Sequence, residues 1–180
     1  YQGQGFPDKD FVMLRLNGPW SRERHVKTRR LESGIQSIQS LCGASSAEHN
    51  PFLALMRPNA DESQGEVFGF SFVYSGNFLA QVEVDSFDLT RVMMGIHPQE
   101  FTWKLEPGQQ FQTPEVVMVY SDGGLGKMSR TYHKPYRKRL ARGKWRDFPR
   151  PILLNNWEAT YFCFDADTTL KRVSKTTDAR

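Results

Sequence analysis

The stretch Val67-Phe-Gly-Phe-Ser-Phe-Val-Tyr74, with Phe78-Leu-Ala-Gln-Val-Glu-Val84 after it, indicates the fold class. The first run is rich in aromatic and branched residues, which favour strands. In the second run apolar residues alternate with polar ones, and a period of two is typical of a half-buried strand. Ser75-Gly76-Asn77 lies between them. A short loop that contains glycine predicts a β-hairpin over residues 67–84.

Further short strands are predicted on both sides of this hairpin. They lie at Phe11–Leu16, Phe101–Leu105 and Glu115–Tyr120. Many short strands separated by turn residues are typical of an antiparallel β-sandwich. We therefore expect residues 1–127 to form a mainly β domain, an antiparallel β-sandwich.

The periodicity changes after the last of these strands. Apolar residues recur every four positions and form one helical stripe, which consists of Met128, Tyr132, Tyr136 and Leu140. Pro135 lies inside the stripe, and a proline in a helix interior costs about 3 kcal/mol. We therefore expect the helix to be kinked there or to begin later. A polar connector with Gly143 and Pro149 follows, so residues 128–150 are predicted to be a linker helix and a basic connector.

The net charge of +4 is concentrated in one segment of the chain. Arg130–Arg150 holds nine Lys and Arg residues against the single acid Asp147. With Tyr132, Tyr136 and Trp145, such a segment would suit a nucleic-acid binder. We interpret it instead as a solvated face or an ion-pair network and expect no nucleic-acid partner. No apolar run approaches the ~18 residues of a membrane helix, so no membrane partner is expected either.

The run Ser121-Asp-Gly-Gly-Leu-Gly-Lys127 has the composition of a phosphate loop but not its spacing. Ser129 stands where a dinucleotide fingerprint needs its third glycine, and Met128 stands where a P-loop needs Ser or Thr. We predict a simple strand-to-helix turn.

The histidines and cysteines show no pattern of a metal or disulfide site. The four histidines are far apart in the sequence, at His25, His49, His97 and His133. None lies at metal-ligand spacing from another His or Cys, so each is interpreted as structural. Cys42 and Cys163 would allow one bridge but no disulfide framework, and Cys42 is interpreted as a buried small hydrophobe. We expect no metal and no cofactor, and the compartment stays open.

The stretch Pro151-Ile-Leu-Leu-Asn-Asn-Trp-Glu-Ala-Thr160 carries the strongest indication of function. Ile152–Leu154 has the pattern of a buried strand, and it ends in two amides, an indole and a carboxylate. In a β/α barrel, ligands bind at that end of the strands. An indole face beside polar groups suits the apolar face and hydroxyl edge of a sugar. We therefore predict that a barrel begins within residues 151–180 and that Trp157 binds substrate, with ordinary barrel packing as the alternative.

Glu158 is a candidate catalytic acid, but it lacks a convincing partner. Retaining glycosidases need two carboxylates about 5–5.5 Å apart. Asp165 and Asp167 follow on the same segment and are expected to point elsewhere. We therefore predict no catalytic residue within this chain, and we expect Glu158 to anchor a loop or to hydrogen-bond a neighbouring strand.

Several motifs together resemble family 36 of the glycoside hydrolases, the α-galactosidases or melibiases. Those that look like the family's amino-terminal β-sandwich are Gly5-Phe-Pro-Asp-Lys-Asp-Phe11, Ser33-Gly34 with Ala44-Ser-Ser46, His49-Asn-Pro-Phe52, Gly69-Phe-Ser-Phe72 and Gln81-Val-Glu-Val84. Thr113–Val116 and Tyr132-His133 resemble its final strand and the helix after it, and Pro151–Phe162 resembles the first barrel strand. The resemblance covers residues 1–165, and the motifs occur in the family's order.

The resemblance implies a sandwich followed by a (β/α)8 barrel and a small β domain. It also implies retaining hydrolysis of terminal α-galactose from melibiose, raffinose and stachyose. Both catalytic aspartates would lie on later barrel strands, so this chain alone, with an incomplete sandwich and an incomplete barrel, is expected to be inactive. Of the family's galactose pocket only Trp157 carries over, as a wall. Cys163 stands where the family usually has an aspartate, in Tyr161-Phe-Cys-Phe164.

Other functions stay open at this point. One is a non-catalytic carbohydrate-binding sandwich, which would need exposed aromatic residues in line on one face. Another is a relative that transfers galactose to make raffinose-type sugars. The expected partner is a galactosyl oligosaccharide. The resemblance also leaves open that the full-length protein forms a homo-oligomer.

Overall fold

The computed structural model describes residues 4–6, 8–45, 48–153, 155, 157–167 and 169–170. The chain divides into two compact units, Tyr1–Tyr136 and Arg137–Arg180, and each is described by itself. None of the helices in the described part of the chain is long and apolar enough to cross a membrane.

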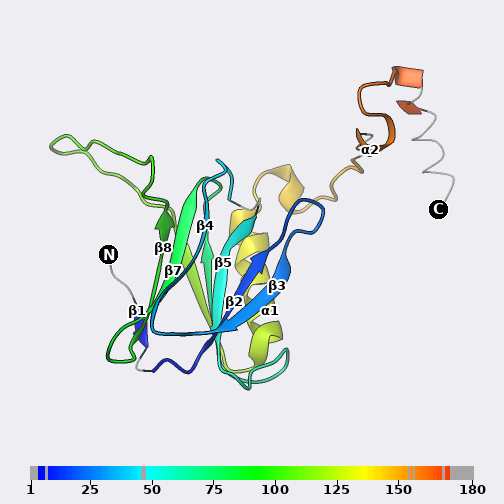
Figure 1. Ribbon diagram of the computed structural model, residues 1–180. Helices are drawn as coiled ribbons and strands as arrows, with labels where there is room; N and C mark the ends of the chain where they lie inside the picture. The colour runs from blue at the N-terminus through cyan, green and yellow to red at the C-terminus, as the bar shows by residue number, and fades with distance from the viewer. Residues whose placement is uncertain are drawn as a thin grey trace. The chain divides into compact units, whose positions relative to one another are not determined.

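The first unit is a sandwich of two antiparallel sheets, as predicted (Figure 1). One sheet has four strands in the order β1 (Gln4–Phe6), β8 (Thr90–Ile96), β7 (Phe78–Val84) and β4 (Gly34–Ser40). The other has five strands in the order β3 (His25–Arg30), β2 (Val12–Asn17), β5 (His49–Met56), β6 (Val67–Phe72) and β9 (Val116–Ser121).

The main core lies between the two sheets and follows from alternation along the strands. Every second residue of β7 is buried, and Phe78, Ala80 and Val82 are 0% exposed. Side chains of the five-stranded sheet pack in the same cluster, among them Leu53 and Phe70. Residues that alternate in this way place one face of each sheet in the core, which is how two sheets form a sandwich.

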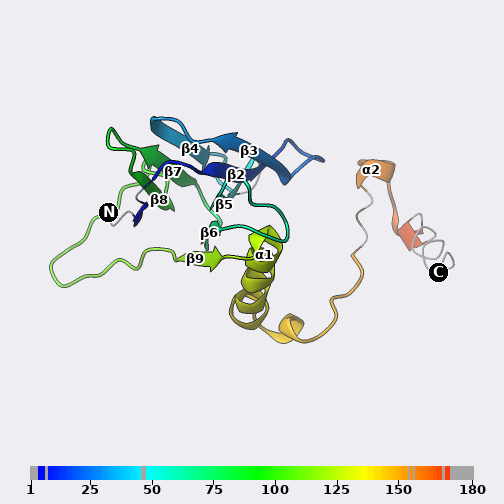
Figure 2. The same ribbon diagram turned by 90° about the horizontal axis from the view of Figure 1, so that it is seen from below.

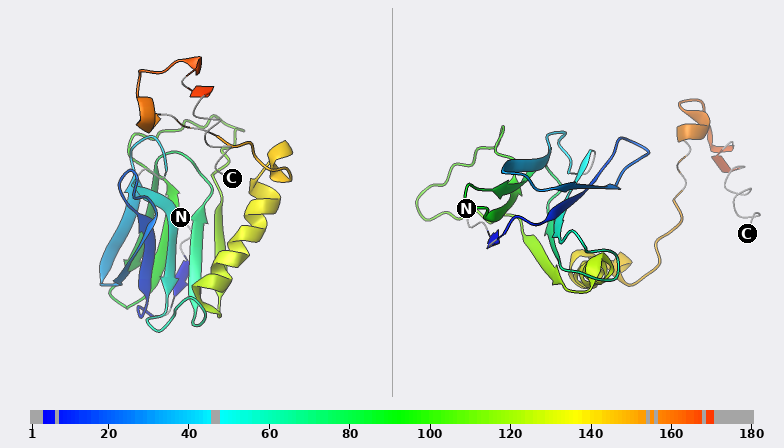
Figure 3. Two further views of the ribbon diagram at one scale, coloured as in Figure 1. Left: turned by 90° about the vertical axis from the view of Figure 1, so that its right-hand side faces the viewer. Right: turned by 60° about the horizontal axis from the view of Figure 1, so that its bottom comes forward.

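A second cluster lies on the outer face of the five-stranded sheet. The helix α1 (Gly124–Pro135) packs there against β6 and β9 (Figures 2 and 3). Met128 and Tyr132 of the predicted helical stripe are buried against Leu14, Ala54 and Val119. Beside α1, a groove runs along this outer face over parts of β2, β3 and β5.

The predicted hairpin over residues 67–84 is wrong, although both of its strands exist. β6 pairs with β5 and β9, whereas β7 pairs with β4 and β8. Residues 73–77 therefore cross from one sheet to the other. Both strands carry large apolar residues on one face, such as Phe72 and Phe78. Those faces meet across the core, so the two strands do not pair edge to edge.

The predicted strand at Phe101–Leu105 is also wrong. These residues belong to an irregular connection between β8 and β9 that extends away from the sheets (Figure 2). Their aromatic side chains pack on the opposite limb of the connection, where the ring of Phe111 lies 5.9 Å from Phe101 and 4.8 Å from Trp103. Aromatic contacts within the loop, rather than strand pairing, account for the strand-like run of apolar residues at 101–105.

Pro135 has a different effect from either one predicted. The helix begins at Gly124 and Pro135 is its last residue, after which Tyr136–Leu140 continue as a π-helical turn. Proline lacks the N–H of a helix interior and clashes with the preceding turn, so the α-helix ends there.

In the second unit, the described part of the predicted barrel strand, Ile152 and Leu153, does not form a strand. Residues 151–153 have no regular secondary structure, and Ile152 and Leu153 are 78% and 90% exposed. Leu154 lies outside the described residues. A parallel strand needs hydrogen-bonded neighbours and helices over its faces, and no described strand pairs with residues 151–153. The described elements of this unit include a 3-10 turn at Lys144–Arg146 and the short helix α2 (Trp157–Thr160).

Candidate functional site

Trp157, the predicted substrate-binding residue, is the first residue of α2. Its backbone N–H donates to the side-chain oxygen Oδ1 of Asn155 at 3.0 Å, and its carbonyl accepts from the N–H of Tyr161 at 2.8 Å. Asparagine readily bonds to the backbone two residues on, which favours such a turn. Asn155, which follows the apolar run, therefore helps to form the turn that carries the indole.

The indole belongs to a small aromatic cluster rather than to a finished core. The rings of Tyr161 and Phe162 lie 5.6 Å and 4.9 Å from it, both edge to face. Trp157 is 42% exposed, and Phe162 is 86% exposed. Aromatic residues of this size are usually well buried or engaged with a partner. The cluster leaves apolar area open, which suits a surface that further structure or a ligand completes.

The carboxylates near Trp157 do not form a defined pair in the described residues. Glu158 lies in α2, and its side chain is outside the described part of the chain. Asp165 and Asp167 are exposed, and the backbone carbonyl of Asp165 accepts from the N–H of Thr169 at 3.1 Å. Cys163 is an exposed free thiol. The role of Trp157 and the absence of a catalytic pair stay predictions.

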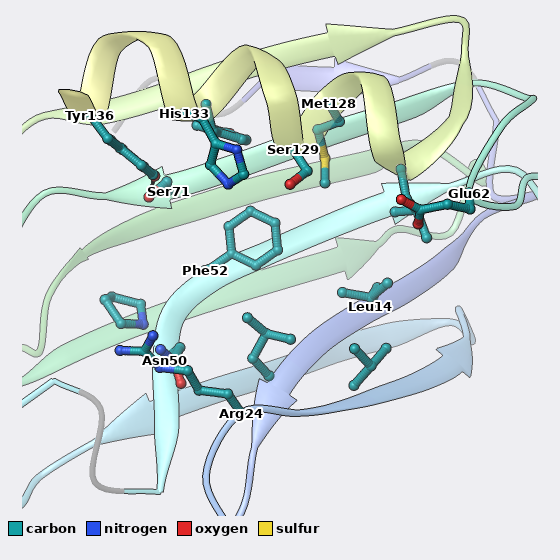
Figure 4. Close-up of a pocket in the computed structure, with 15 residues that line it drawn as sticks. Leu14, Arg24, Asn50, Phe52, Glu62, Ser71, Met128, Ser129, His133 and Tyr136 are labelled. Carbon is teal, nitrogen blue, oxygen red and sulfur yellow. Dashed lines mark hydrogen bonds between the residues drawn. The ribbon is translucent and has the colours of Figure 1, made fainter. Parts of the chain in front are cut away.

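The first unit holds a second candidate site, the α1 groove, which lies between α1 and the uncovered part of the five-stranded sheet (Figure 4). Its volume is about 460 Å³. The groove is apolar along Leu14, Leu16 and Phe52, with Arg24 and Asn50 on one side and Ser129 and His133 of α1 on the other. Nothing in the sequence pattern predicted this groove, because its walls come from the separate elements β2, β3, β5, β6 and α1 and from residues between them.

The aromatic residues of the α1 groove are mostly committed to packing. Tyr132 is 4% exposed, stacks on Tyr136 at 5.6 Å, and donates its hydroxyl to the carbonyl of Val117 at 2.9 Å. Burial raises the pKa of the Tyr132 hydroxyl, so that it remains a donor. Tyr136 donates its hydroxyl to Ser71. The ring of Phe52 packs edge to face on Tyr132 at 5.9 Å, so the groove lacks the line of exposed rings that a carbohydrate-binding sandwich would need.

The glycine-rich turn before α1 uses its donors within the fold. The N–H groups of Gly124, Leu125 and Gly126 donate to carbonyls of the β5–β6 loop: to Gly65 at 3.0 Å, to Asp61 at 2.9 Å and to Glu62 at 2.9 Å. A phosphate site needs such N–H groups to point at the ligand. The prediction of a simple strand-to-helix turn is confirmed.

The β5–β6 loop is held in shape by Asp61. Its carboxylate accepts from the N–H of Ser63 at 2.8 Å and from that of Gln64 at 3.0 Å. The hydrogen bond from Ser63 is the main cause that lowers the pKa of Asp61. The pKa of Asp85, in the β7–β8 turn, is lowered mainly by the N–H of Leu89.

These lowered pKa values predict a loss of stability in acid. A carboxylate whose pKa is lower in the folded state stabilises the fold above its unfolded pKa of about 4. That contribution is lost as the pH falls through the folded pKa. We expect the urea midpoint to change little between about pH 7 and 5 and to fall towards pH 3. Asp61→Asn should reduce the fall, and an unchanged acid dependence in that variant would contradict the assignment.

The histidine and cysteine candidates are structural or surface residues, and the prediction for Cys42 needs a correction. Buried His97 accepts at Nδ1 from the N–H of Gln99 at 3.0 Å, and its Nε2 lies 3.1 Å from Oε1 of Gln39. Cys42 is exposed, not buried as predicted, because it lies in the turn after β4 rather than in the strand. Among the described residues no three His, Cys, Asp or Glu side chains are grouped to hold a metal ion.

The basic segment Arg130–Arg150 has the features of a solvated face. All nine of its Lys and Arg residues are exposed. Arg146 pairs with Asp147 at 2.7 Å, and the ammonium of Lys144 lies 4.4 Å from the ring centre of Trp145. Trp145 is thus engaged locally, which weakens the argument for a nucleic-acid surface built on it.

Comparison with known proteins places this geometry in a family. The model of the glycosyl hydrolase family 36 N-terminal domain matches residues 4–106, and the melibiase model matches residues 110–179. The chain is 62% identical over 162 residues to the α-galactosidase AgaA of Geobacillus stearothermophilus. It is 47% identical over 169 residues to a probable α-galactosidase G of Aspergillus terreus. These matches cover 90% and 94% of the chain, but 22% and 23% of the relatives.

Solved structures agree with the sequence comparison. The AgaA variant crystallised with stachyose superposes with a TM-score of 0.87 at 60% identity, over 94% of this chain and 24% of that one. The α-galactosidase of Lactobacillus brevis superposes with a TM-score of 0.90 at 41% identity, over 98% of this chain and 24% of that one. This chain thus spans about a quarter of the length of the relatives it matches. Because the N-terminal domain model alone matches more than half of its residues, the chain belongs to glycosyl hydrolase family 36.

Proposed function

We propose that the chain is part of an α-galactosidase that removes terminal non-reducing α-D-galactose from oligosaccharides such as melibiose, raffinose and stachyose. The observation that carries the proposal is the 62% identity to AgaA over 90% of the chain. Variants of that enzyme have been crystallised with stachyose and with raffinose. Identity at this level along nearly the whole chain favours the same substrate class.

The proposed mechanism is retaining double displacement. A nucleophilic carboxylate would form a glycosyl-enzyme intermediate, and a second carboxyl group would act first as acid and then as base. Both aspartates would come from barrel strands outside residues 1–180. Within the chain, the proposed contribution is Trp157, whose indole would pack against the apolar face of the galactose ring.

The proposed division of the chain is a sandwich over 1–127, a linker over 128–150 and the start of the barrel over 151–180. The two family models also divide the chain, but they do so between residues 106 and 110, before β9 rather than after it. Met128 and Tyr132 are buried on the sheet. The first part of α1 therefore packs as part of the sandwich. After Tyr136 the chain enters the second compact unit.

Isolated residues 1–180 should release no p-nitrophenol from p-nitrophenyl α-galactoside above the blank, because they lack the proposed catalytic aspartates. A longer polypeptide read from the same gene should release it. The gene itself gives an independent check, since the sequence after codon 180 should continue into a strand that ends in two aspartates and then a helix. Release by the isolated chain would contradict the proposal and would point to Glu158 with Asp165 or Asp167, which Glu158→Gln would test.

A further inference from the structure

One dipeptide at the end of β2 combines a chemically reactive sequence with a closely packed backbone. Asn17-Gly18 is the one place in the 180-residue sequence where glycine follows asparagine. In such a pair the backbone nitrogen of the glycine can attack the side-chain amide carbon of the asparagine, because glycine has no Cβ to hinder the approach. This attack is the first step of spontaneous deamidation, so the dipeptide is intrinsically labile.

The fold requires the glycine of this pair. A Cβ on Gly18 would lie 1.8 Å from the backbone carbonyl oxygen of Arg22, in the loop between β2 and β3. The N–H of Arg22 donates to the carbonyl of Pro19 at 2.9 Å, so the loop turns back on Gly18. The side-chain oxygen of Asn17 is buried without a hydrogen-bond partner among the described residues. Packing therefore keeps the glycine, while no hydrogen bond to that oxygen anchors the amide that it would attack.

The intact sheet holds the same backbone on both sides. The N–H of Gly18 donates to the carbonyl of Glu48 at 3.0 Å. Asn17 is paired with His25 of β3 and with His49 of β5. Attack requires the glycine nitrogen to lose its proton and the asparagine backbone to rotate until nitrogen meets carbon. A hydrogen-bonded N–H next to a residue paired on both sides permits neither step.

This end of the sheet is also the place where β2 and β5 pair irregularly. Their register shifts between Arg15 and Asn17, and residues 50–52 of β5 lie opposite Leu16. A bulge leaves residues unpaired and disrupts the ladder locally. Strand ends open at a lower free energy than the centre of a domain. We therefore expect the pairing at Asn17 to open before the whole sandwich unfolds.

We propose that Asn17 is a deamidation site that the hydrogen bond from Gly18 to Glu48 keeps closed and that reacts when this end of the sheet opens. In the open state the Gly18 nitrogen gives its proton to hydroxide and bonds to Cγ of Asn17. The bond from Cγ to Nδ2 breaks, and the amide nitrogen takes a proton from water and leaves as ammonia. Water then opens the cyclic imide at either carbonyl, which gives aspartate or isoaspartate.

The products do not fit the native pairing. Both carry a new negative charge, and isoaspartate adds one carbon to the backbone between residues 17 and 18. Strand register depends on the spacing of successive residues, so that carbon displaces Gly18 from Glu48. Opening of this end of the sheet therefore exposes the chain to permanent damage. Each contact in this site joins residues of the first unit to one another, so none of them depends on further polypeptide.

Peptide mapping by mass spectrometry tests the proposal on residues 1–180 kept in mildly alkaline buffer. One sample is folded, as checked by near-UV circular dichroism, and the other is unfolded in guanidinium chloride. Asn17 should convert in the unfolded sample and roughly tenfold or more slowly in the folded one. Asn77 is the internal control, because bulky Phe78 follows it and it should stay intact in both samples. Asn17→Gln should abolish the conversion, since the longer side chain closes the less favourable six-membered ring.

Hydrogen exchange at the amide of Gly18 gives a second measurement. Exchange needs only the loss of the bond to Glu48, whereas attack also needs rotation of the backbone. Folding should therefore slow deamidation of Asn17 by at least the protection factor of the Gly18 amide. A smaller effect would overturn the proposal, as would equal rates in folded and unfolded chain. An unfolded chain that stays intact at Asn17, or that reacts first at Asn77, would overturn it as well.

Discussion

Gly124→Ala should destabilise the first unit by about 4 kcal/mol, which corresponds to a fall in Tm of roughly 10 °C for a chain of this size. Gly124 has a φ of +71°, which favours glycine. A Cβ there would lie 2.5 Å from the carbonyl oxygen of Asp61 and 2.7 Å from the backbone N of Gln64. Both neighbours are backbone atoms, so no side-chain rotation relieves the contact.

Gly108→Ala separates the two causes of this loss. Gly108 also has a positive φ, of +84°, but a Cβ there would meet nothing within 4 Å. It should therefore cost only the conformational strain, about 1 kcal/mol. The difference between the two variants, measured by urea unfolding at neutral pH, reports the close contact of α1 with the β5–β6 loop. Equal losses in both variants would show that the contact contributes little.

The contact at Gly124 matters because it fixes where α1 begins. The helix has no side-chain cap, and its first N–H groups donate to the loop carbonyls of Gly65, Asp61 and Glu62 instead. A shift of the loop would leave those donors without partners, at a cost of about 1–3 kcal/mol for each donor that is buried. The same loop shapes one end of the α1 groove through Glu62. Helix position, groove and sandwich are therefore coupled at this turn.

The elements of the sandwich could be predicted from sequence because each strand carries its own pattern. Alternation in Phe78–Val84 requires one buried face, whatever the partner strands are. The pairing could not be predicted in the same way. The loop Ser75-Gly76-Asn77 fits a hairpin turn as well as a crossover, and only the packing of Phe72 and Phe78 across the core decides between them. Local patterns report burial, whereas the sheet to which a strand belongs is a property of the whole domain.

The error at Phe101–Leu105 and the irregular backbone of residues 151–153 have a related origin. Both runs have strand-like composition, but a strand exists only where another backbone accepts its hydrogen bonds. Phe101 and Trp103 pack their rings on Phe111 within the loop. Ile152 and Leu153 pair with no strand among the residues that the structure describes.

The candidate site was accessible to sequence analysis only where one segment carries it. Asn155, Trp157 and Tyr161 are close in sequence, and the turn that they form could be anticipated from residue types. The α1 groove combines Leu14, Phe52 and Ser129 from distant segments, and no periodicity connects them. Sites of that second kind emerge only once the sheet order and the helix position are known.

Trp157→Ala should lower kcat/KM for raffinose by about 30- to 100-fold in a polypeptide extended to the length of the family, or roughly 2–3 kcal/mol of transition-state stabilisation. The reason is the loss of the indole face from the proposed galactose pocket. Stability should change little, because Trp157 is 42% exposed and, in the described part of the chain, packs on the rings of Tyr161 and Phe162. Steady-state kinetics with raffinose and with p-nitrophenyl α-galactoside would measure the loss.

Trp145→Ala is the matched control for that measurement. Trp145 is 41% exposed, almost the same as Trp157, and its ring lies under the ammonium of Lys144 in the basic connector. Its removal deletes the same indole outside the proposed pocket, so kcat/KM should stay within about twofold of the unmodified enzyme. Because the pocket wall would contact galactose itself, Trp157→Ala should reduce activity on both substrates alike. Equal activity of the two variants would mean that Trp157 serves only to pack the first strand of the barrel.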